Sequence, residues 1–153
     1  MRTVLFYTSF HKFTGAYLKV WDYFNHVLSS PDHTPLVRLS EPTVWDETNP
    51  WRGLEQQRIV SGNGPVDADI AFHSGLSWLQ VQPEHREDPP IPVINLIQHV
   101  RHAYPENPRH EFLSHKAIRI CVAPEVTEAI LDTGLVRGPV FTIPDAIDFA
   151  LPT

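Results

Sequence analysis

Residues 118–143 read IRICVAPEVTEAILDTGLVRGPVFTI, and the order of apolar and polar residues in this stretch predicts a strand, a helix and a second strand. The first strand is expected over Ile118–Val122. Pro124 opens the helix and Gly134 stands just after its end, which are the places that proline and glycine prefer. Val140–Ile143 supplies the second strand. This order is typical of the repeating unit of an α/β fold.

Short apolar runs separated by helical or loop segments continue through the rest of the chain. A long helix is predicted over Gly15–Ser29, because its apolar residues recur at three- and four-residue spacing. Further strands are expected at Val4–Tyr7, Leu36–Leu39, Arg58–Val60, Ile70–Phe72 and Pro92–Ile97, and further helices at Arg109–Lys116 and Pro124–Asp132. We therefore expect an α/β, Rossmann-like, mostly parallel sheet of about six or seven strands with helices on both faces.

Length and composition predict one soluble globular domain over residues 1–153. The chain has 153 residues, of which 42% are hydrophobic and 20% charged, and no internal repeat divides it. Its formal net charge is −6 at pH 7 and it has no basic stripe, so nucleic acid is a poor candidate partner. The apolar runs are too short to span a membrane. Contact with a membrane surface is neither excluded nor indicated.

Cysteine usage points to a reducing compartment. Cys121 is the only cysteine, which excludes an internal disulfide and a cysteine-based zinc site. Its apolar neighbours predict a buried, unreactive thiol. The first ten residues do not have the pattern of a secretory signal, so the cytoplasm is the expected location.

The loop over Thr8–Gly15 is the first of three polar segments expected at the carboxyl ends of strands, where open parallel sheets bind their ligands. Hydroxyl groups, a cation and a glycine at a helix start suit an anion or a sugar hydroxyl, with Thr14 and Gly15 as substrate contacts. An equal alternative is that Gly15 only eases the packing of strand against helix. The loop has no GxGxxG or GxxxxGK[ST] pattern, so a dinucleotide or P-loop site is not supported.

Histidines follow two further strands. His73 ends one of them and is a candidate substrate contact, expected to face either the ligand crevice or the neighbouring loop. After the next strand, His99 is the candidate catalytic residue, because its imidazole can bind a hydroxyl or take its proton as a general base. Gln98 and Arg101 are candidate substrate contacts, the latter for a phosphate or carboxylate. A solvated polar loop is the alternative for this segment.

Two other features are weaker indications of a site. His99 and His102 have ligand-like spacing, but no HExxH motif or cysteine pair completes a metal site, and none is predicted. Trp45 and Trp51 stand in a long loop over Ser40–Leu54, where they can stack on a sugar or cap the core. Capping the core is the favoured interpretation.

Three stretches in the second half carry a family resemblance: PVINLIQH at 92–99, HKAIRICVAPEVTEAI at 115–130 and GPVFTIPDAID at 138–148. Together they resemble the acceptor-side half of retaining, group-1-type glycosyltransferases of the GT-B fold. The opening strand and DIAFHSG at 69–75 also resemble that family, so the similarity touches nearly the whole chain. The IPDAID segment is its most specific part. The family usually has two glycines in the first loop and Asn-Gly where this chain has Asp145-Ala146.

The resemblance implies the acceptor-binding domain of a sugar-nucleotide-dependent glycosyltransferase. In that family the active site lies between two Rossmann-like domains, the first binding mainly the acceptor and the second the sugar nucleotide. The resemblance implies that these 153 residues lack the donor-binding C-terminal domain, so they are expected to be inactive alone and to bind no cofactor by themselves. Its implied partners are a carbohydrate or glycolipid acceptor and a donor-binding domain in the same or a separate chain. By position, Gly15 matches the family's glycine-rich loop, and His99, or Gln98 beside it, matches a histidine that contacts substrate hydroxyls.

Two other classes of function stay open. A free-standing flavodoxin-like binding or regulatory module is favoured if the last strand packs at the sheet edge and side chains close the crevice. A metal-dependent hydrolase that uses the histidines is the third hypothesis, and stoichiometric zinc would support it.

Overall fold

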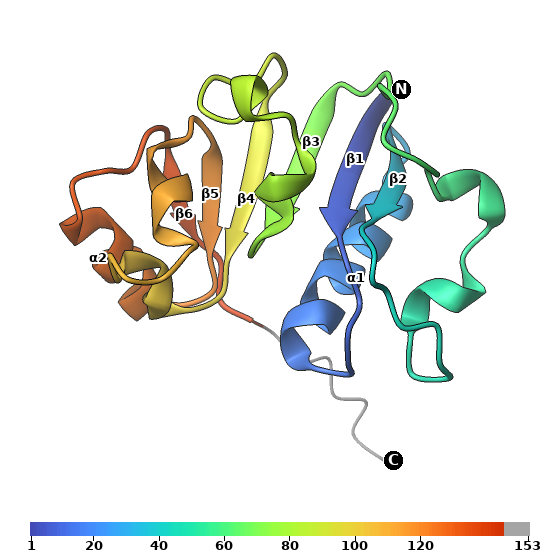
Figure 1. Ribbon diagram of the computed structural model, residues 1–153, viewed down its shortest axis with the longest axis horizontal. Coiled ribbons are helices and arrows are strands. Elements are labelled where there is room, and N and C mark those ends of the chain that lie inside the picture. The colour runs from blue at the N-terminus through green and yellow to red at the C-terminus, as the bar shows by residue number, and fades with distance from the viewer. Residues whose placement is uncertain (146–153) are drawn as a thin grey trace.

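Six parallel strands form one sheet in the order β2-β1-β3-β4-β5-β6 (Figure 1). The computed structural model describes residues 1–145. The strands are β1 (Arg2–Thr8), β2 (His33–Leu39), β3 (Ile70–Ser74), β4 (Val93–Ile97), β5 (Ile118–Cys121) and β6 (Val140–Thr142). The predicted α/β class, with a Rossmann-like parallel sheet, is confirmed.

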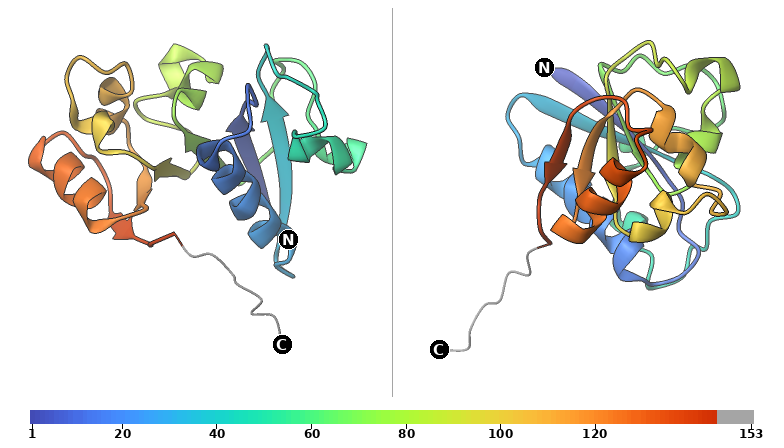
Figure 2. Two further views of the ribbon diagram at one scale, coloured as in Figure 1. Left: turned by 90° about the horizontal axis from the view of Figure 1, so that it is seen from below. Right: turned by 90° about the vertical axis from the view of Figure 1, so that its left-hand side faces the viewer.

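Two α-helices lie against opposite faces of the sheet within the described part of the chain (Figure 2). They are α1 (Gly15–Leu28) and α2 (Pro124–Asp132), and α2 has the predicted bounds. The other connections use six short 3₁₀ helices, which are η1 (Pro50–Gly53), η2 (Gln56–Arg58), η3 (Ser77–Gln80), η4 (Pro83–His85), η5 (Val100–Ala103) and η6 (His110–Ser114). The helix predicted over Arg109–Lys116 is therefore a single 3₁₀ segment. No helix in residues 1–145 is long and apolar enough to cross a membrane.

The short strand predicted at Arg58–Val60 is wrong. This segment makes one isolated bridge, between Ile59 and Val37, and Arg58 belongs to η2. A single bridge beside the edge of β2 does not extend the sheet, so the strand count over residues 1–145 is six. Edge strand β2 begins at His33, earlier than predicted, because its pairing with β1 starts at Arg2.

Aromatic side chains fill the core between α1 and the sheet. Phe6 of β1 stacks on Phe72 of β3, with ring centroids 4.6 Å apart, and meets Phe24 of α1 edge-on at 5.3 Å. Trp51, which is 1% exposed, packs edge-on against Phe24. Trp51 therefore caps the core, as favoured from the sequence, whereas Trp45 is 45% exposed. Burial of each large apolar side chain contributes about 2–3 kcal/mol to folding.

The opposite face is covered by α2 and by the 3₁₀ helices η3, η5 and η6. Val126 and Ile130 of α2 pack on Ile97 of β4 and Cys121 of β5. Cys121 is a free, buried thiol, as predicted, and burial raises its pKa. Both properties make it a poor nucleophile.

The strand order reverses beside β1, and this reversal determines where a ligand can bind. The chain passes from β1 to β2 on one side and returns to β3 on the other, so the loops that follow β1 and β3 separate. In open α/β sheets the binding crevice forms at such a point, outside the carboxyl ends of the strands.

Candidate functional site

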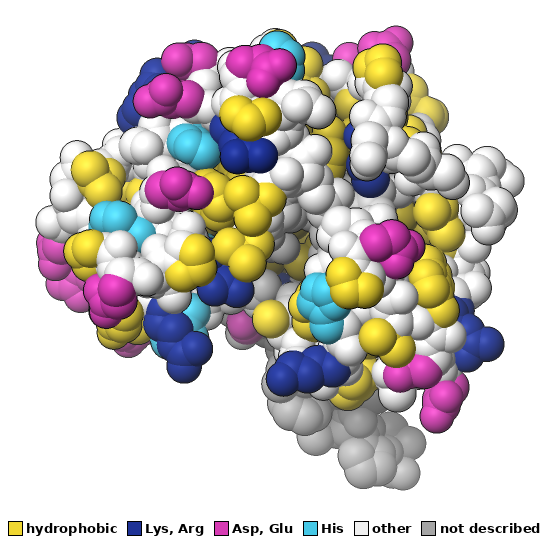
Figure 3. Space-filling model, viewed as in Figure 1, with side chains coloured by type: hydrophobic (Ala, Val, Ile, Leu, Met, Phe, Trp, Pro, Cys, Tyr) yellow, Lys and Arg dark blue, Asp and Glu magenta, His cyan; other side chains and the backbone are white. Residues whose placement is uncertain are grey.

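A cleft of about 740 Å³ opens at the carboxyl ends of β1, β3 and β4, where the strand order reverses. We call it the switch-point cleft. Its walls come from the loop after β1, the segment from β3 into η3, and the segment from β4 into η5. Figure 3 shows Lys and Arg side chains on both sides of the hollow below the strand ends. The position matches the crevice predicted from the sequence.

Four of the six residues predicted from the sequence line this cleft: Thr14, Gln98, His99 and Arg101. Gly15 lies between two lining residues, Thr14 and Ala16, at the first turn of α1. His73 is not among the lining residues. Segments 82 residues apart in the chain meet here, since the Gln98 amide nitrogen donates to the Ala16 carbonyl oxygen at 3.1 Å.

Thr14 and Gly15 form the start of α1. The Thr14 hydroxyl oxygen caps the helix by accepting from the Tyr17 N–H at 3.4 Å, and the first turn carries no acidic residue. A Cβ added at Gly15 would meet no atom within 4 Å. The alternative that Gly15 eases strand–helix packing is therefore not supported. Its lack of a side chain instead leaves open space beside the cleft.

His99 is exposed and holds a defined ring orientation. Its Nδ1 accepts a hydrogen bond from the Arg101 backbone N–H at 3.1 Å and so caps η5. A neutral imidazole with Nδ1 as acceptor carries its hydrogen on Nε2. Nε2 can therefore donate to a ligand hydroxyl. A role as general base would require the ring to give up the bond to Arg101.

His73 has a structural place, in contrast to its predicted contact with substrate. It is 1% exposed, and its ring lies between Tyr7 and Trp78 with centroids 4.6 and 4.5 Å away. Its Nδ1 is 3.0 Å from the Ser77 hydroxyl, which also accepts from the Ser74 N–H. Burial lowers the pKa of His73 to about 3, and the charge on His115 adds to this effect. The residue orders the segment after β3 as a neutral ring.

Two further basic residues line the cleft: Lys12 is the cation noted in the first loop, and Arg109 was missed from the sequence. Arg109 comes from the segment before η6, where a helix was expected. The Nε of Arg109 is 3.7 Å from the position of a Cβ at Gly75, so the guanidinium lies over the turn after β3. Sequence spacing gave no sign of this contact, because Arg109 and Gly75 are joined only by the fold.

The cleft is more basic than the chain as a whole. Its lining holds Lys12, Arg101 and Arg109 against one carboxylate, Glu41. Within residues 1–145, no carboxylate lies within 4.0 Å of these three cations. His102 also lines the cleft, but burial, aided by the charge of Arg109, lowers its pKa to about 4 and keeps it neutral at pH 7. A chain of net charge −6 thus concentrates unpaired positive charge at this site, which favours an anionic ligand.

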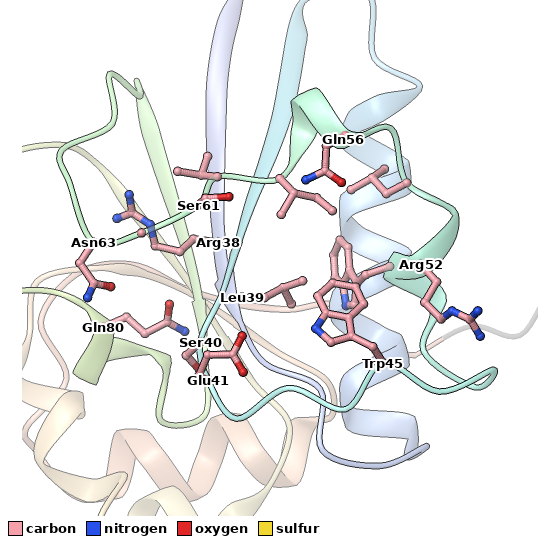
Figure 4. A pocket seen from close by; sticks show the side chains of 15 residues that line it. Arg38, Leu39, Ser40, Glu41, Trp45, Arg52, Gln56, Ser61, Asn63 and Gln80 are labelled. Atoms are coloured by element: carbon pink, nitrogen blue, oxygen red, sulfur yellow. The ribbon is translucent and has the colours of Figure 1, made fainter.

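A second pocket of about 870 Å³ lies beside the first, next to edge strand β2 (Figure 4). We call it the edge pocket. Ser40, Glu41 and Gln80 line both cavities, so the two are neighbours along one surface.

Within residues 1–145, no group of three or more His, Cys, Asp or Glu side chains is arranged to bind a metal ion. The hydrolase hypothesis therefore gains no support from this part of the chain.

Comparison with protein-family models, with curated proteins and with solved structures gave no match for this chain.

Proposed function

We propose that this chain is the acceptor-binding domain of a sugar-nucleotide-dependent glycosyltransferase of the GT-B fold, and that the switch-point cleft binds the acceptor. One observation carries the proposal: Thr14, Gln98, His99 and Arg101, selected from the sequence alone, line a single cleft. They come from loops after β1 and β4 that only the fold brings together.

The chemistry of the cleft suits a polyhydroxylated ligand with an anionic group. The Nε2–H of His99 can donate to a sugar hydroxyl, and Thr14 adds a hydroxyl of its own. Arg101 and Arg109 are free to pair with a phosphate or carboxylate. A glycolipid phosphate or a sugar phosphate combines both kinds of group.

A retaining transfer has two requirements, and this chain serves one. The acceptor hydroxyl must be held close to the sugar carbon, and the leaving diphosphate must be neutralised. The cleft serves the first requirement, and a donor-binding domain in the same or a separate chain would serve the second. The isolated chain is therefore expected to bind acceptor without transferring sugar, in a reducing cytoplasm that suits its single buried thiol.

The end of the IPDAID motif lies outside the described residues, which stop at Asp145. Asp145 itself forms an ion pair with Lys19 of α1 at 3.0 Å. That contact brings the start of the motif to the helix whose first turn borders the cleft. The family's Asn-Gly is replaced at this point, which weakens the match within the most specific segment of the resemblance.

A flavodoxin-like binding module is the second candidate. The position of β6 at the sheet edge favours it. The open switch-point cleft does not, because that module was expected to have its crevice closed by side chains. Ligand chemistry separates the two candidates.

The test is a titration of the ¹⁵N-labelled protein with glucose, galactose, mannose and N-acetylglucosamine. Acceptor binding should move the Gln98 side-chain amide and the His99 ring resonances. The informative variant is His99→Asn, because asparagine keeps a side-chain oxygen to cap η5 but removes the ring N–H. It should weaken sugar binding about tenfold, which is ~1.4 kcal/mol. His26→Asn, exposed on α1, is the matched control. Absence of shifts with every sugar, or equal affinity in both variants, would reject the proposal.

A further inference from the structure

Arg38 of β2 is a buried cation without a carboxylate partner. It is 8% exposed, and no Asp or Glu in the described part of the chain lies within 4.0 Å of it. Its guanidinium carbon is 6.0 Å from the ring centroid of Tyr7, and Nη2 donates to the Gly64 carbonyl oxygen. Burial of a charge is unfavourable unless the charge is paired. These two contacts leave the pairing of Arg38 incomplete.

The nitrogens of Arg38 show where the missing partner belongs. Nε is buried and has no hydrogen-bond partner. Nη1 also has no hydrogen-bond partner among residues 1–145, but unlike Nε it is exposed to solvent. Arg38 lines the edge pocket, so a ligand in that pocket can reach Nη1. Nη1 is thus the nitrogen that can donate to a carboxylate or a phosphate in the pocket, whereas Nε lies on the other edge of the guanidinium and is shielded. The structure therefore points to an oxyanion on the pocket side of Arg38.

The rest of the edge pocket has two chemically different ends. Figure 4 shows Arg38, Asn63 and Gln80 gathered at one end and Trp45 at the other. The Gln80 amide nitrogen is already engaged, since it donates to the Thr8 carbonyl oxygen at 2.9 Å. Trp45 offers an exposed indole, the kind of surface that accepts the apolar face of a sugar ring. One end is thus suited to a charged group and the other to a ring.

The single acidic residue of the edge pocket is Glu41, at the boundary with the switch-point cleft. Its Oε2 accepts from the Thr43 N–H at 3.1 Å, which engages part of its charge. The lining also contains Arg38 and Arg52, so positively charged side chains outnumber negatively charged ones in this pocket. The cavities are neighbours along this wall, so a ligand of two units would cross it to occupy both.

We propose that the edge pocket is a second subsite, which binds an acidic sugar unit with its oxyanion on Arg38 and its ring against Trp45. This inference rests on the proposed function, because it takes the neighbouring unit in the switch-point cleft to be the acceptor. It narrows the acceptor class to saccharides of at least two units that carry a carboxylate or a phosphate. The oxyanion supplies the negative charge that Arg38 lacks and an acceptor for its Nη1–H.

The experiment compares glucuronic acid, glucose 6-phosphate and glucose as probes of the ¹⁵N-labelled protein. The reporters are the Trp45 indole N–H, assigned with Trp45→Phe, and the Arg38 Nε–H. Either acid should shift both reporters at concentrations at least tenfold below those that glucose requires. A response to glucuronic acid alone identifies a carboxylate ligand, and a response to glucose 6-phosphate alone identifies a phosphate ligand.

Arg38→Gln should abolish the Trp45 shift while leaving the shift of the Gln98 amide in the switch-point cleft intact. Asn63→Ala changes an exposed residue and should weaken acid binding even if Arg38→Gln fails to fold. Arg2→Gln, exposed at the start of β1, is the control of matched charge change.

The subsite is refuted if the acids act no more strongly than glucose on Trp45, or if Arg38→Gln and Asn63→Ala both leave the Trp45 shift unchanged. A glucose shift at Gln98 with no acid effect at Trp45 would reject the subsite and leave the proposed function standing. Acid shifts at Trp45 with no sugar effect at Gln98 would reject the proposed function and the assignment of the acceptor.

Discussion

The ring of His73 stacks on the indole of Trp78 with 4.5 Å between centroids and 9° between planes. Tyr7 covers the other face of the imidazole at 4.6 Å, also within 9° of parallel. A ring enclosed in this way has little contact with water, so its charged form is disfavoured. The pKa of His73 falls to about 3 for this reason, and that of half-buried His115, which packs edge-on against Trp78, is also lowered by burial.

This stacking predicts that the protein loses stability in mild acid. Below its unfolded pKa of 6.5, His73 takes up a proton in the unfolded chain but not in the folded one until about pH 3; His102 does the same down to about pH 4. Stability is therefore fully present above pH 6.5 and falls with decreasing pH, by about 1.4 kcal/mol per pH unit for each histidine. Urea unfolding at pH 7.5, 6.5, 5.5 and 4.5 measures the slope. His73→Phe should reduce the slope by one proton and His26→Gln should not; equal slopes in the two variants would contradict the assignment.

Gly138 has no room for a side chain. Its φ is +109°, and a Cβ there would lie 2.1 Å from the Ala117 carbonyl oxygen. Gly138→Ala should lower the free energy of unfolding by about 2–5 kcal/mol, through backbone strain and displacement of the strand beside it.

Gly134→Ala separates the two contributions, because φ is +70° there but the space is open. It should cost about 1–2 kcal/mol. Chemical denaturation compares the two, and similar losses would mean that the close contact relaxes without cost.

Arg119 joins η6 to the edge of the sheet through backbone carbonyls. It is fully buried and donates to the carbonyl oxygens of Phe112, His115, Ala117 and Arg137 at 2.7–3.3 Å. Burial lowers its pKa to about 10, so it still carries its charge at pH 7.

Loss of this donor set should destabilise the fold. Arg119→Met leaves several buried carbonyls without donors and should cost about 3–5 kcal/mol in urea unfolding at pH 7.5. Arg119→Lys keeps the charge but not the planar fork, and should cost less. Wild-type stability in Arg119→Met would show that water replaces the guanidinium.

Elements with a signal at each end were predictable from the sequence. Pro124 and Gly134 bracket α2, and its predicted bounds agree with the structure. Strand β2 was predicted too short because it starts with polar residues at a sheet edge, where only pairing with β1 reveals the strand. Runs of apolar residues predict strands that are buried on both faces, and they underestimate the length of strands at the sheet edge.

The position of the cleft was predictable because strand ends and polar loops are local features of the sequence. The burial of His73 was not predictable, because it depends on a segment that packs over β3 only in the folded chain. Alternation along β3 places Ala71 and His73 on the face covered by Trp78 of η3. No local pattern of residues indicates that the 3₁₀ helix η3 returns to cover that face. Arg109 was missed for the same reason, since its place over Gly75 depends on how two loops pack. Contacts between loops far apart in the chain are what the sequence alone could not supply.

Substitution of Gly15 tests whether this residue is needed for stability or for ligand binding. A Cβ there meets no protein atom, and alanine has the higher helix propensity, so Gly15→Ala should leave the free energy of unfolding unchanged or raise it by up to about 1 kcal/mol. The methyl group would project beside the switch-point cleft, between lining residues Thr14 and Ala16. Sugar binding should therefore weaken about tenfold although the fold gains stability. Gly53→Ala also has open space around the added methyl, and neither Gly53 nor its neighbours line the switch-point cleft, so it is the matched control for that cleft. Titration of both variants with the same sugars decides the matter: unchanged binding in Gly15→Ala would mean that the ligand does not approach the start of α1.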